Sequence, residues 1–363
     1  MPAIGPQRTG IAYLPLHYGK APRWLFERMV KLAREITFAL VGEYGAEEML
    51  KRLSHPYWFQ AFGCVLGYDW HSSGVTTTLC GAIKEGISGR EQELGFFVAG
   101  GKGKTSRKTP AEIEKWGELI SLAPAPLVYA SRMSAKVDSA AVQDGYQLYH
   151  HAFIFTRSGS WAVIQQGMNA TNRYARRYHW LSEAVSNFVN EPHSAVLSET
   201  RGQALNLVAG ESEPARNIIA QIAREQKPER IIADLKKIKA LTLPAHHHLG
   251  TGDLHPDSLN KILLSAYERQ PQDFEHLLGL PGVGPKTIRA LSLISELIHG
   301  VAPSYRDPAR YSFAHGGKDG IPYPVDRKTY DQSIELLRKA IQKTKLDTGE
   351  KKEAFQRLDR VRI

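Results

Sequence analysis

The chain has 363 residues, of which 42% are hydrophobic and 23% charged, so its composition is that of a globular protein with two or three domains rather than a disordered or fibrous chain. We find no apolar run long enough to cross a membrane and no signal-peptide pattern, so we expect a cytoplasmic protein and not a membrane protein. The net charge of +10 favours polyanionic partners such as nucleic acid.

The first 190 residues are predicted to form an α+β domain. Apolar residues recur every three or four positions over 24–42, which predicts a helix, and a shorter helix is predicted over 46–53. Aromatic and β-branched residues at 146–156 and 161–167 flank a turn that contains glycine, which predicts an antiparallel hairpin.

Helices are predicted for the rest of the chain. Residues 191–250 are expected to form a helical connector, in which Pro214 and Pro228 stand where helices start. Residues 251–363 are expected to form an all-α domain that ends in a basic helix. The predicted fold class is therefore α+β: a mixed N-terminal domain with an antiparallel hairpin or sheet, then an all-α C-terminal domain with a helix-hairpin-helix.

Residues 279–289, Gly-Leu-Pro-Gly-Val-Gly-Pro-Lys-Thr-Ile-Arg, form the most specific pattern in the chain. Apolar residues recur at helical spacing on both sides, and the glycines between them allow a tight turn that a ligand can approach closely. Because the turn opens a helix, its free N–H groups and the positive end of the helix dipole favour an anion, here a DNA phosphate. The expected DNA contacts of this hairpin are Gly282, Val283, Gly284, Lys286, Thr287 and Arg289.

Residues 273–287 resemble the hairpin region of the endonuclease III-type DNA glycosylases, and residues 324–326 resemble the start of the helix that follows it in that family. The resemblance implies that Asp326 is the catalytic aspartate and Lys286 the amine nucleophile of bifunctional members. Such an amine attacks the sugar of an extruded nucleotide and forms a Schiff base, which permits strand cleavage. On the residues alone, Lys286 could equally contact a phosphate and Asp326 could cap a helix. No cysteine follows the motif, so no iron–sulfur cluster is expected.

A second resemblance covers most of the chain. It is to the prokaryotic family called domain of unknown function 763, and this family brings no activity that can be carried over. The motifs that carry the similarity are Arg8-Thr9-Gly10, Gly19-Lys20-Ala21-Pro22, Trp58-Phe59-Gln60 and Asp69-Trp70-His71-Ser72-Ser73-Gly74-Val75-Thr76-Thr77.

Polar residues of catalytic type gather in the N-terminal two-thirds of the chain. A carboxylate before a hairpin, with polar residues on the paired strands, is a common way to hold Mg²⁺ or Mn²⁺ in a nuclease. His150 and His151 would point to opposite faces of a strand, so at most one faces a common site. The alternative is a set of buried polar pairs with a structural role. The candidate catalytic residues are Asp69, His71, Lys136, Asp138 and His150, and the candidate metal ligands are Asp138, Asp144 and His150.

Basic residues elsewhere supply further candidate phosphate contacts. Lys102 and Lys104 lie in a Gly-rich segment that we expect to be a solvated loop, because Val98 stands where a nucleotide-binding loop needs its first glycine. Arginines interleave with aromatic residues over 172–180, where the pattern predicts a helix from 174 to 189. Either the arginines meet phosphates and the rings stack on bases, or the rings are core and the arginines solvated. The arginines concerned are Arg173, Arg176 and Arg177.

Three consecutive histidines, 246–248, with His255 nearby, suggest a zinc site. Consecutive histidines cannot all converge on one ion, and no pair of cysteines lies near them. A solvated loop is therefore the expected structure of this segment.

These patterns together predict a DNA-processing protein of the repair or recombination type, which contacts duplex or structured DNA mainly through phosphates. Strand cleavage would occur either by a metal-dependent nuclease or by a glycosylase and abasic-site lyase. The alternative is a non-enzymatic binder of distorted or branched DNA. Assembly as a homo-oligomer is compatible with both.

Overall fold

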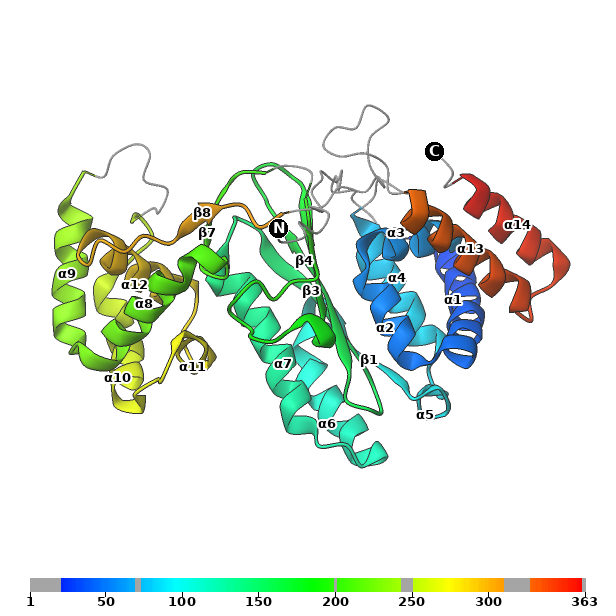
Figure 1. The fold of residues 1–363 in the computed structure, drawn as a ribbon, viewed down its shortest axis with the longest axis horizontal. Coiled ribbons are helices and arrows are strands. Elements are labelled where there is room, and N and C mark those ends of the chain that lie inside the picture. Colours follow the sequence, from blue (N-terminus) through cyan, green and yellow to red (C-terminus); the bar gives the residue numbers. More distant parts are fainter. Residues whose placement is uncertain (1–20, 69–72, 199–200, 243–250, 310–326, 361–363) are drawn as a thin grey trace, which may run out of the picture.

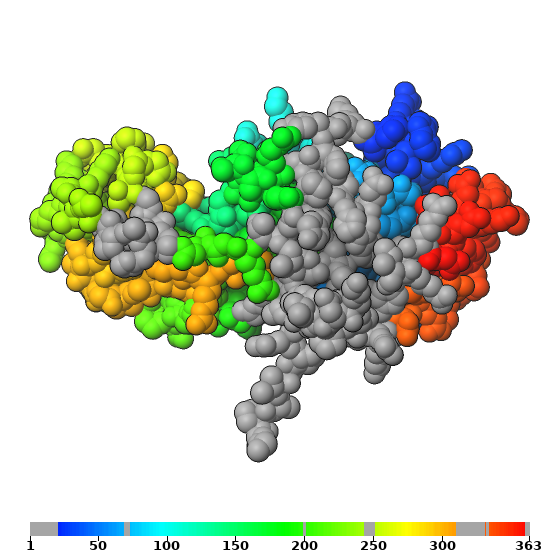
Figure 2. Space-filling view, turned by 90° about the horizontal axis from the view of Figure 1, so that it is seen from above, coloured from blue at the N-terminus to red at the C-terminus, as the bar shows by residue number. Residues whose placement is uncertain are grey.

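The computed structural model describes residues 21–68, 73–198, 201–242, 251–309 and 327–360. It combines helices with antiparallel sheets, which confirms the predicted α+β class (Figure 1). The larger sheet stands in the middle of the molecule with helices on both faces. Seen from above, residues 213–242 and 251–297 lie at one end of an elongated body, and residues 327–360 lie at the other (Figure 2).

The central sheet has five antiparallel strands, in the order β1 (Phe96–Lys102), β3 (Gln147–Thr156), β4 (Trp161–Met168), β5 (Ala175–Leu181) and β6 (Ala195–Leu197). The predicted hairpin is confirmed as β3 and β4. The helix predicted over 174–189 is wrong, because its first half is the strand β5. Six consecutive residues of β5 are buried, and a strand covered on both faces lacks the alternating pattern that would have revealed it.

The N-terminal helices cover one face of the sheet, called here the first face. Their cluster of buried apolar residues includes Val98, Ile154 and Ile164 of the sheet. The helices predicted over 24–42 and 46–53 are confirmed as the first two of the set. The set consists of α1 (Arg23–Tyr44), α2 (Ala46–Ser54), α3 (Pro56–Val65) and α4 (Gly74–Gly86), followed by the short α5 (Glu91–Leu94).

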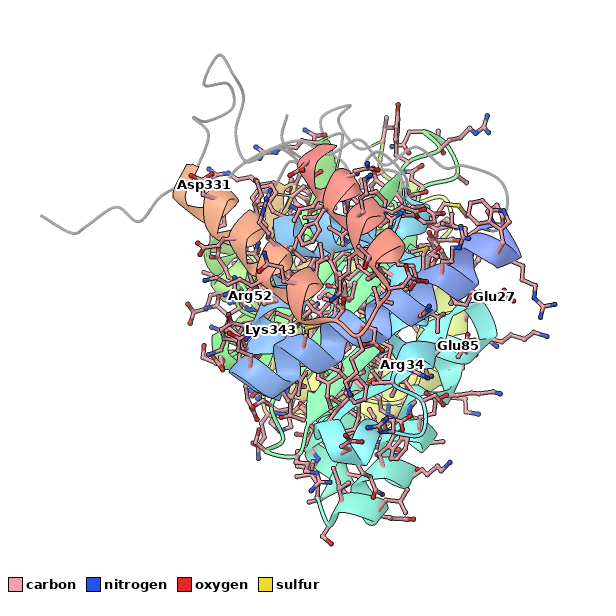
Figure 3. The ribbon with its side chains drawn as sticks, turned by 90° about the vertical axis from the view of Figure 1, so that its right-hand side faces the viewer. Glu27, Arg34, Arg52, Glu85, Asp331 and Lys343 are labelled. Atoms are coloured by element: carbon pink, nitrogen blue, oxygen red, sulfur yellow. The ribbon has the colours of Figure 1, made fainter. Side chains whose placement is uncertain are left out.

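The two C-terminal helices, α13 (Arg327–Lys343) and α14 (Thr348–Arg360), pack on these N-terminal helices. Figure 3 shows them lying over α1, and Leu337 and Leu358 enter the same apolar cluster. An ion pair between Lys343 and Glu43 joins α13 to α1. This packing differs from the predicted unit 251–363, because the apolar stripe of α13 is buried against residues near the other end of the chain.

The second face of the sheet is covered by α6 (Thr109–Ile120) and α7 (Pro124–Lys136). The chain leaves α7 through one π-helical turn, Val137–Ala141, and enters the short strand β2 (Val142–Gln143). A three-stranded antiparallel sheet then forms in the order β2, β7 (Gln203–Asn206) and β8 (Ser304–Arg306). Because β8 belongs to this sheet, the region predicted to be all-α contains a strand.

The remaining helices form a lobe beside the second face. Their buried side chains are continuous with those of α7 and the sheet, so the lobe shares its core with the sheet rather than folding around a separate one. Pro214 and Pro228 lie in the first turns of their helices, as predicted. Within the described ranges, no helix is both long and apolar enough to span a membrane. The lobe consists of α8 (Glu213–Glu225), α9 (Pro228–Ala240), α10 (Asn260–Arg269), α11 (Phe274–Gly279) and α12 (Pro285–Leu297).

Candidate functional site

Residues 280–284 form a tight turn between α11 and α12, and this turn is called here the Gly turn. Asp273 caps α11, since its side chain accepts a hydrogen bond from the amide three residues further on. Gly282 has φ +83°, a left-handed conformation that favours glycine. Pro285 begins α12, where the missing N–H costs nothing. The local sequence therefore specifies both helix ends and the turn between them.

Lys136, at the end of α7, supports the Gly turn from the side of α7. Its Nζ donates to the carbonyl oxygens of Leu280, at 2.9 Å, and Val283, at 2.6 Å. Burial lowers the pKa of this half-buried ammonium. Lys136 was predicted to be catalytic, whereas the structure places it as a support of the turn. Since its ammonium satisfies these two carbonyls, the Gly turn is held in one conformation.

The outer surface of the Gly turn carries hydrogen-bond donors. The amides of Gly282 and Gly284 donate to no group in the part of the chain that the structure describes. The first N–H groups of α12 also lack intrahelical acceptors, as at every helix start. Lys286 is exposed, and its ammonium forms no ion pair with another described residue. This surface can therefore bind an anion.

Three of the predicted hairpin contacts are not available at the surface. The side chain of Val283 is buried, and its amide donates to the carbonyl oxygen of Leu280, at 3.3 Å. Thr287 is buried. Arg289 donates from Nε to Gln143 Oε1, at 2.9 Å, and from its guanidinium to Asp253 Oδ1, at 2.7 Å. The same Gln143 donates to the carbonyl oxygen of Pro285, at 2.9 Å. These residues hold the start of α12 in place, and Gly282, Gly284 and Lys286 remain as the candidate contacts.

The basic residues predicted elsewhere divide into exposed and buried ones. Lys102, Lys104 and Arg173 are exposed, so they remain candidate phosphate contacts. The ammonium of Lys102 lies 5.8 Å from the ring centroid of Tyr149. The segment 103–108 is a short 3₁₀ helix and not the expected irregular loop.

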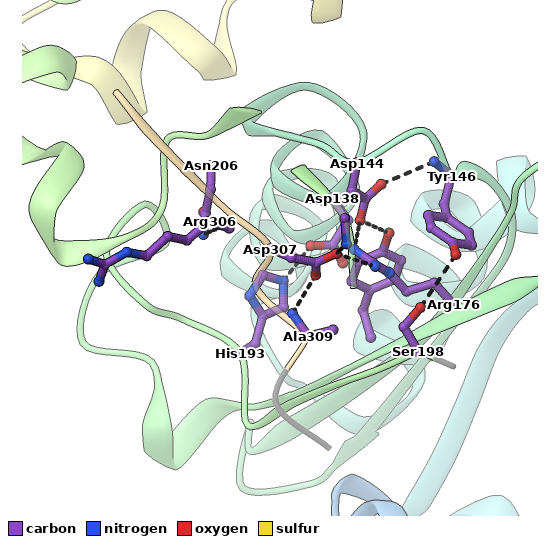
Figure 4. A network of polar contacts seen from close by, with 12 residues as sticks. Asp138, Asp144, Tyr146, Arg176, His193, Ser198, Asn206, Arg306, Asp307 and Ala309 are labelled. Carbon is purple, nitrogen blue, oxygen red and sulfur yellow. Dashed lines mark hydrogen bonds and ion pairs between the residues drawn. The ribbon is translucent and has the colours of Figure 1, made fainter. Parts of the chain in front are cut away.

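Arg176 and Arg177 are fully buried, so the prediction that they contact DNA is wrong for this structure. Arg176 forms ion pairs with Asp144, at 2.8 Å, and Asp307, at 2.7 Å (Figure 4). Arg177 faces the first face of the sheet and donates to Gln60 Oε1, at 3.1 Å. Burial lowers the pKa of Arg177 to about 9. Both arginines belong to β5, an inner strand of the central sheet whose first six residues are buried.

Asp138 is the centre of a buried network on the second face. It lies in the π-helical turn after α7, and its Oδ1 is 2.5 Å from His193 Nε2. Its Oδ2 accepts hydrogen bonds from Trp180 Nε1, at 3.0 Å, and Gln165 Nε2, at 2.5 Å. His193 was missed by the sequence reasoning, because it lies in an irregular segment 55 residues from its partner.

The three predicted metal ligands, Asp138, Asp144 and His150, are not brought together. Asp144 is paired with Arg176, and His150 lies on the first face, opposite Asp138. His151 lies on the second face, where its ring contacts Gln165, so the expected opposite orientation of the two histidines is confirmed. The described ranges contain no group of three or more side chains that could hold a metal ion. Asp138, Asp144 and His150 therefore do not form a common metal site in this structure.

Several predicted site residues lie outside the described ranges. Among the candidate catalytic residues these are Asp69, His71 and Asp326. The three histidines 246–248 of the suggested zinc site also lie outside, and His255 is described and exposed. The pairing of Lys286 with Asp326 stays a prediction.

The fold and the site define an α+β protein in which a central antiparallel sheet supports a helical lobe with an exposed, donor-rich turn. The chain belongs to the family described as "Protein of unknown function (DUF763)", whose model matches residues 10–325. This match confirms the resemblance to domain of unknown function 763 and gives no support to the resemblance to endonuclease III-type DNA glycosylases. No curated protein and no solved structure matches the chain.

Proposed function

We propose that the chain binds the DNA backbone through the Gly turn and the first turn of α12. The observation that supports this proposal is that two carbonyl groups of the turn have hydrogen-bond partners whereas two of its amide groups have none among the described residues. The carbonyls of Leu280 and Val283 accept hydrogen bonds from Lys136, while the amides of Gly282 and Gly284, on an exposed and a half-buried residue, have no acceptor in the described chain. A preformed set of amide donors binds phosphate oxygens without paying to order the turn.

The chemistry of this surface suits a phosphate better than a neutral ligand. Hydrogen bonds to a charged acceptor contribute about 1.5–3 kcal/mol each. The exposed ammonium of Lys286 stands beside these amides, and the chain carries a net charge of +10. Each phosphate neutralised by a basic residue releases counterions, so binding should weaken steeply with salt and depend little on base sequence.

We further propose that this grip serves DNA processing of the repair or recombination type, with strand cleavage as the reaction. Lys286 is exposed and forms no ion pair with a described residue, so its amine is accessible for attack on a sugar beside the bound phosphate. A metal-dependent nuclease is the other route to cleavage. A non-enzymatic binder of distorted or branched DNA is the alternative to both.

The binding proposal is tested with the double variant Gly282→Val and Gly284→Val. Valine at Gly282 is strained at φ +83°, and both side chains would keep a phosphate away from the amides. The matched control is Gly252→Val on the same lobe, where an added Cβ meets no atom within 4 Å. Affinity for duplexes of two unrelated sequences, measured by fluorescence anisotropy, should fall at least about tenfold for the double variant alone. Equal affinities of variant and wild type would rule the proposal out.

The cleavage proposal is tested separately on duplex that contains an abasic site. Borohydride should trap a covalent adduct with the wild type and with none of the Lys286 variants, because only a lysine amine forms the Schiff base. Lys286→Arg is the matched variant, since it keeps the charge for phosphate. If no adduct forms, the lyase route is ruled out. If the protein cuts DNA and a chelator abolishes the cutting, the result favours a metal-dependent nuclease. If the protein binds DNA without cutting it, the non-enzymatic binder remains.

A further inference from the structure

A cleft of about 630 Å³ opens beside the Gly turn, between α7 and the end of α11. Its walls are largely apolar, with Pro124, Val128 and Met133 among the lining residues. Lys136 and Gly279 also line it, so the cleft and the Gly turn share a wall. Its volume is within the range of about 300–1,000 Å³ that is usual for small-molecule sites.

Tyr129 presents an aromatic ring to this cleft in a fixed orientation. Its hydroxyl donates to Glu275 Oε1, at 2.6 Å, and its ring packs edge-on against Phe188 with centroids 5.6 Å apart. The residue nevertheless remains 43% exposed. Because the ring is held from two sides, a planar ligand can stack on its open surface without ordering it first.

The charges of the cleft favour an anionic ligand. Arg132 lines the cleft, is exposed, and has no hydrogen-bond or ion-pair partner among the described residues. Lys136 adds a second positive charge at the wall shared with the Gly turn. Glu114 is the one carboxylate among the lining residues, and it can accept a hydrogen bond from an amino or imino group of a ring.

We propose that this cleft holds one unstacked nucleotide of the DNA whose backbone the Gly turn grips. Its base would stack on Tyr129 and its phosphate would meet Arg132. The inference rests on the proposed DNA binding, and it specifies the kind of DNA that the protein prefers. Stacking on an aromatic side chain contributes about 1–3 kcal/mol, whereas unpairing a base within a duplex costs a few kcal/mol. The protein should therefore favour DNA in which a nucleotide is already unpaired, at a gap, a flap or an end.

The test compares two probes, a blunt duplex and the same duplex with a short single-stranded extension. Wild type should bind the extended probe about 5- to 150-fold more tightly, which corresponds to the stacking of one base. Tyr129→Leu and Arg132→Met should bring this ratio close to one, and Tyr129→Phe should keep it because the ring is retained. Tyr44→Leu, at an exposed tyrosine of α1, is the control and should leave the ratio unchanged. Thermal unfolding shows that each variant is folded.

A fluorescent adenine analogue, 2-aminopurine, placed at the first unpaired position should be quenched by wild type and by Tyr129→Phe but not by Tyr129→Leu. An unchanged ratio in Tyr129→Leu and in Arg132→Met would overturn the inference.

The double variant Gly282→Val and Gly284→Val separates the two proposals. If the double variant binds neither probe while wild type binds both equally well, only the cleft proposal is wrong. If the double variant binds the blunt duplex as tightly as wild type does, the proposed DNA binding by the Gly turn is itself wrong.

Discussion

Lys136 and Val283 are joined by a hydrogen bond of 2.6 Å between Nζ and the carbonyl oxygen, although they are 147 residues apart in the sequence. A second bond from the same ammonium reaches Leu280, at 2.9 Å. A helix that packs on the central sheet therefore controls the conformation of a turn in the neighbouring lobe. The orientation of the turn, and hence the direction of its free amides, depends on this contact.

Lys136→Met should remove this support while keeping the length and apolar stem of the side chain. Hydrogen bonds that involve a charged group contribute about 1.5–3 kcal/mol, so we expect a lower free energy of unfolding and DNA affinity reduced by about 10- to 150-fold. Urea unfolding and anisotropy measure the two effects. Lys237→Met, at an exposed lysine of α9, is the control and should change neither. Full DNA affinity in Lys136→Met would show that the support does not matter for binding.

The stability of the fold should decrease in mild acid because of buried histidines, among them His150, His151 and His179. Burial lowers the pKa of His150 to about 3 and that of His151 to about 4. Burial also lowers the pKa of His179. Among the residues that the structure describes, neither ring nitrogen of His150 has a hydrogen-bond partner to hold a proton. The unfolded chain takes up protons near pH 6.5, so it binds more protons than the folded chain from about pH 6.5 down to the folded pKa values. The contribution of these histidines to the free energy of unfolding is therefore at its full value above pH 6.5, and it decreases as the pH falls below 6.5.

Each of these histidines accounts for at most about 1.4 kcal/mol per pH unit in that window. Urea unfolding at pH 7.5, 6.0 and 5.0 measures the slope. His151→Gln should make it shallower, and the exposed His255→Gln should leave it unchanged. If the free energy of unfolding depends on pH equally in wild type, His151→Gln and His255→Gln, then His151 is not held neutral in the folded state.

Asp144→Asn should be strongly destabilising, because it leaves the buried guanidinium of Arg176 with one carboxylate instead of two. Removing one partner of a buried ion pair costs about 3–5 kcal/mol. The matched control is Glu27→Gln in the exposed pair with Arg23, which should cost less than about 1 kcal/mol. Thermal denaturation compares the two variants, and equal effects would argue against a buried pair at Arg176.

Leu337→Ala should reveal which part of the protein α13 stabilises. Leu337 is fully buried in the cluster of α1 to α4, and truncating a buried leucine costs about 2–5 kcal/mol. Amide hydrogen exchange should therefore accelerate in α1 before it does so in α8 to α12. Leu119→Ala, at a leucine that is 54% exposed, is the control. Faster exchange confined to the lobe would support the predicted helical unit 251–363 instead.

Local patterns were sufficient wherever the structure depends on neighbours in the sequence. The three-to-four-residue spacing of α1, the strands on either side of the hairpin turn and the prolines that start α8 and α9 were all predictable. The strand β5 was not, because burial on both faces removed its alternation. Of the site, the Gly turn was found from sequence, whereas Lys136 was identified as important but assigned to catalysis.

The sequence by itself determined that a tight turn starts a helix at Gly282 to Pro285, because positive φ, helix caps and proline act over only a few residues. The tertiary structure decided which way that turn faces and what stands beside it. It also paired Asp138 with His193, buried Arg176 and Arg177, and packed α13 on α1. These relationships join residues far apart in the chain, and they depend on which apolar surfaces are buried together, a property that no short segment carries by itself.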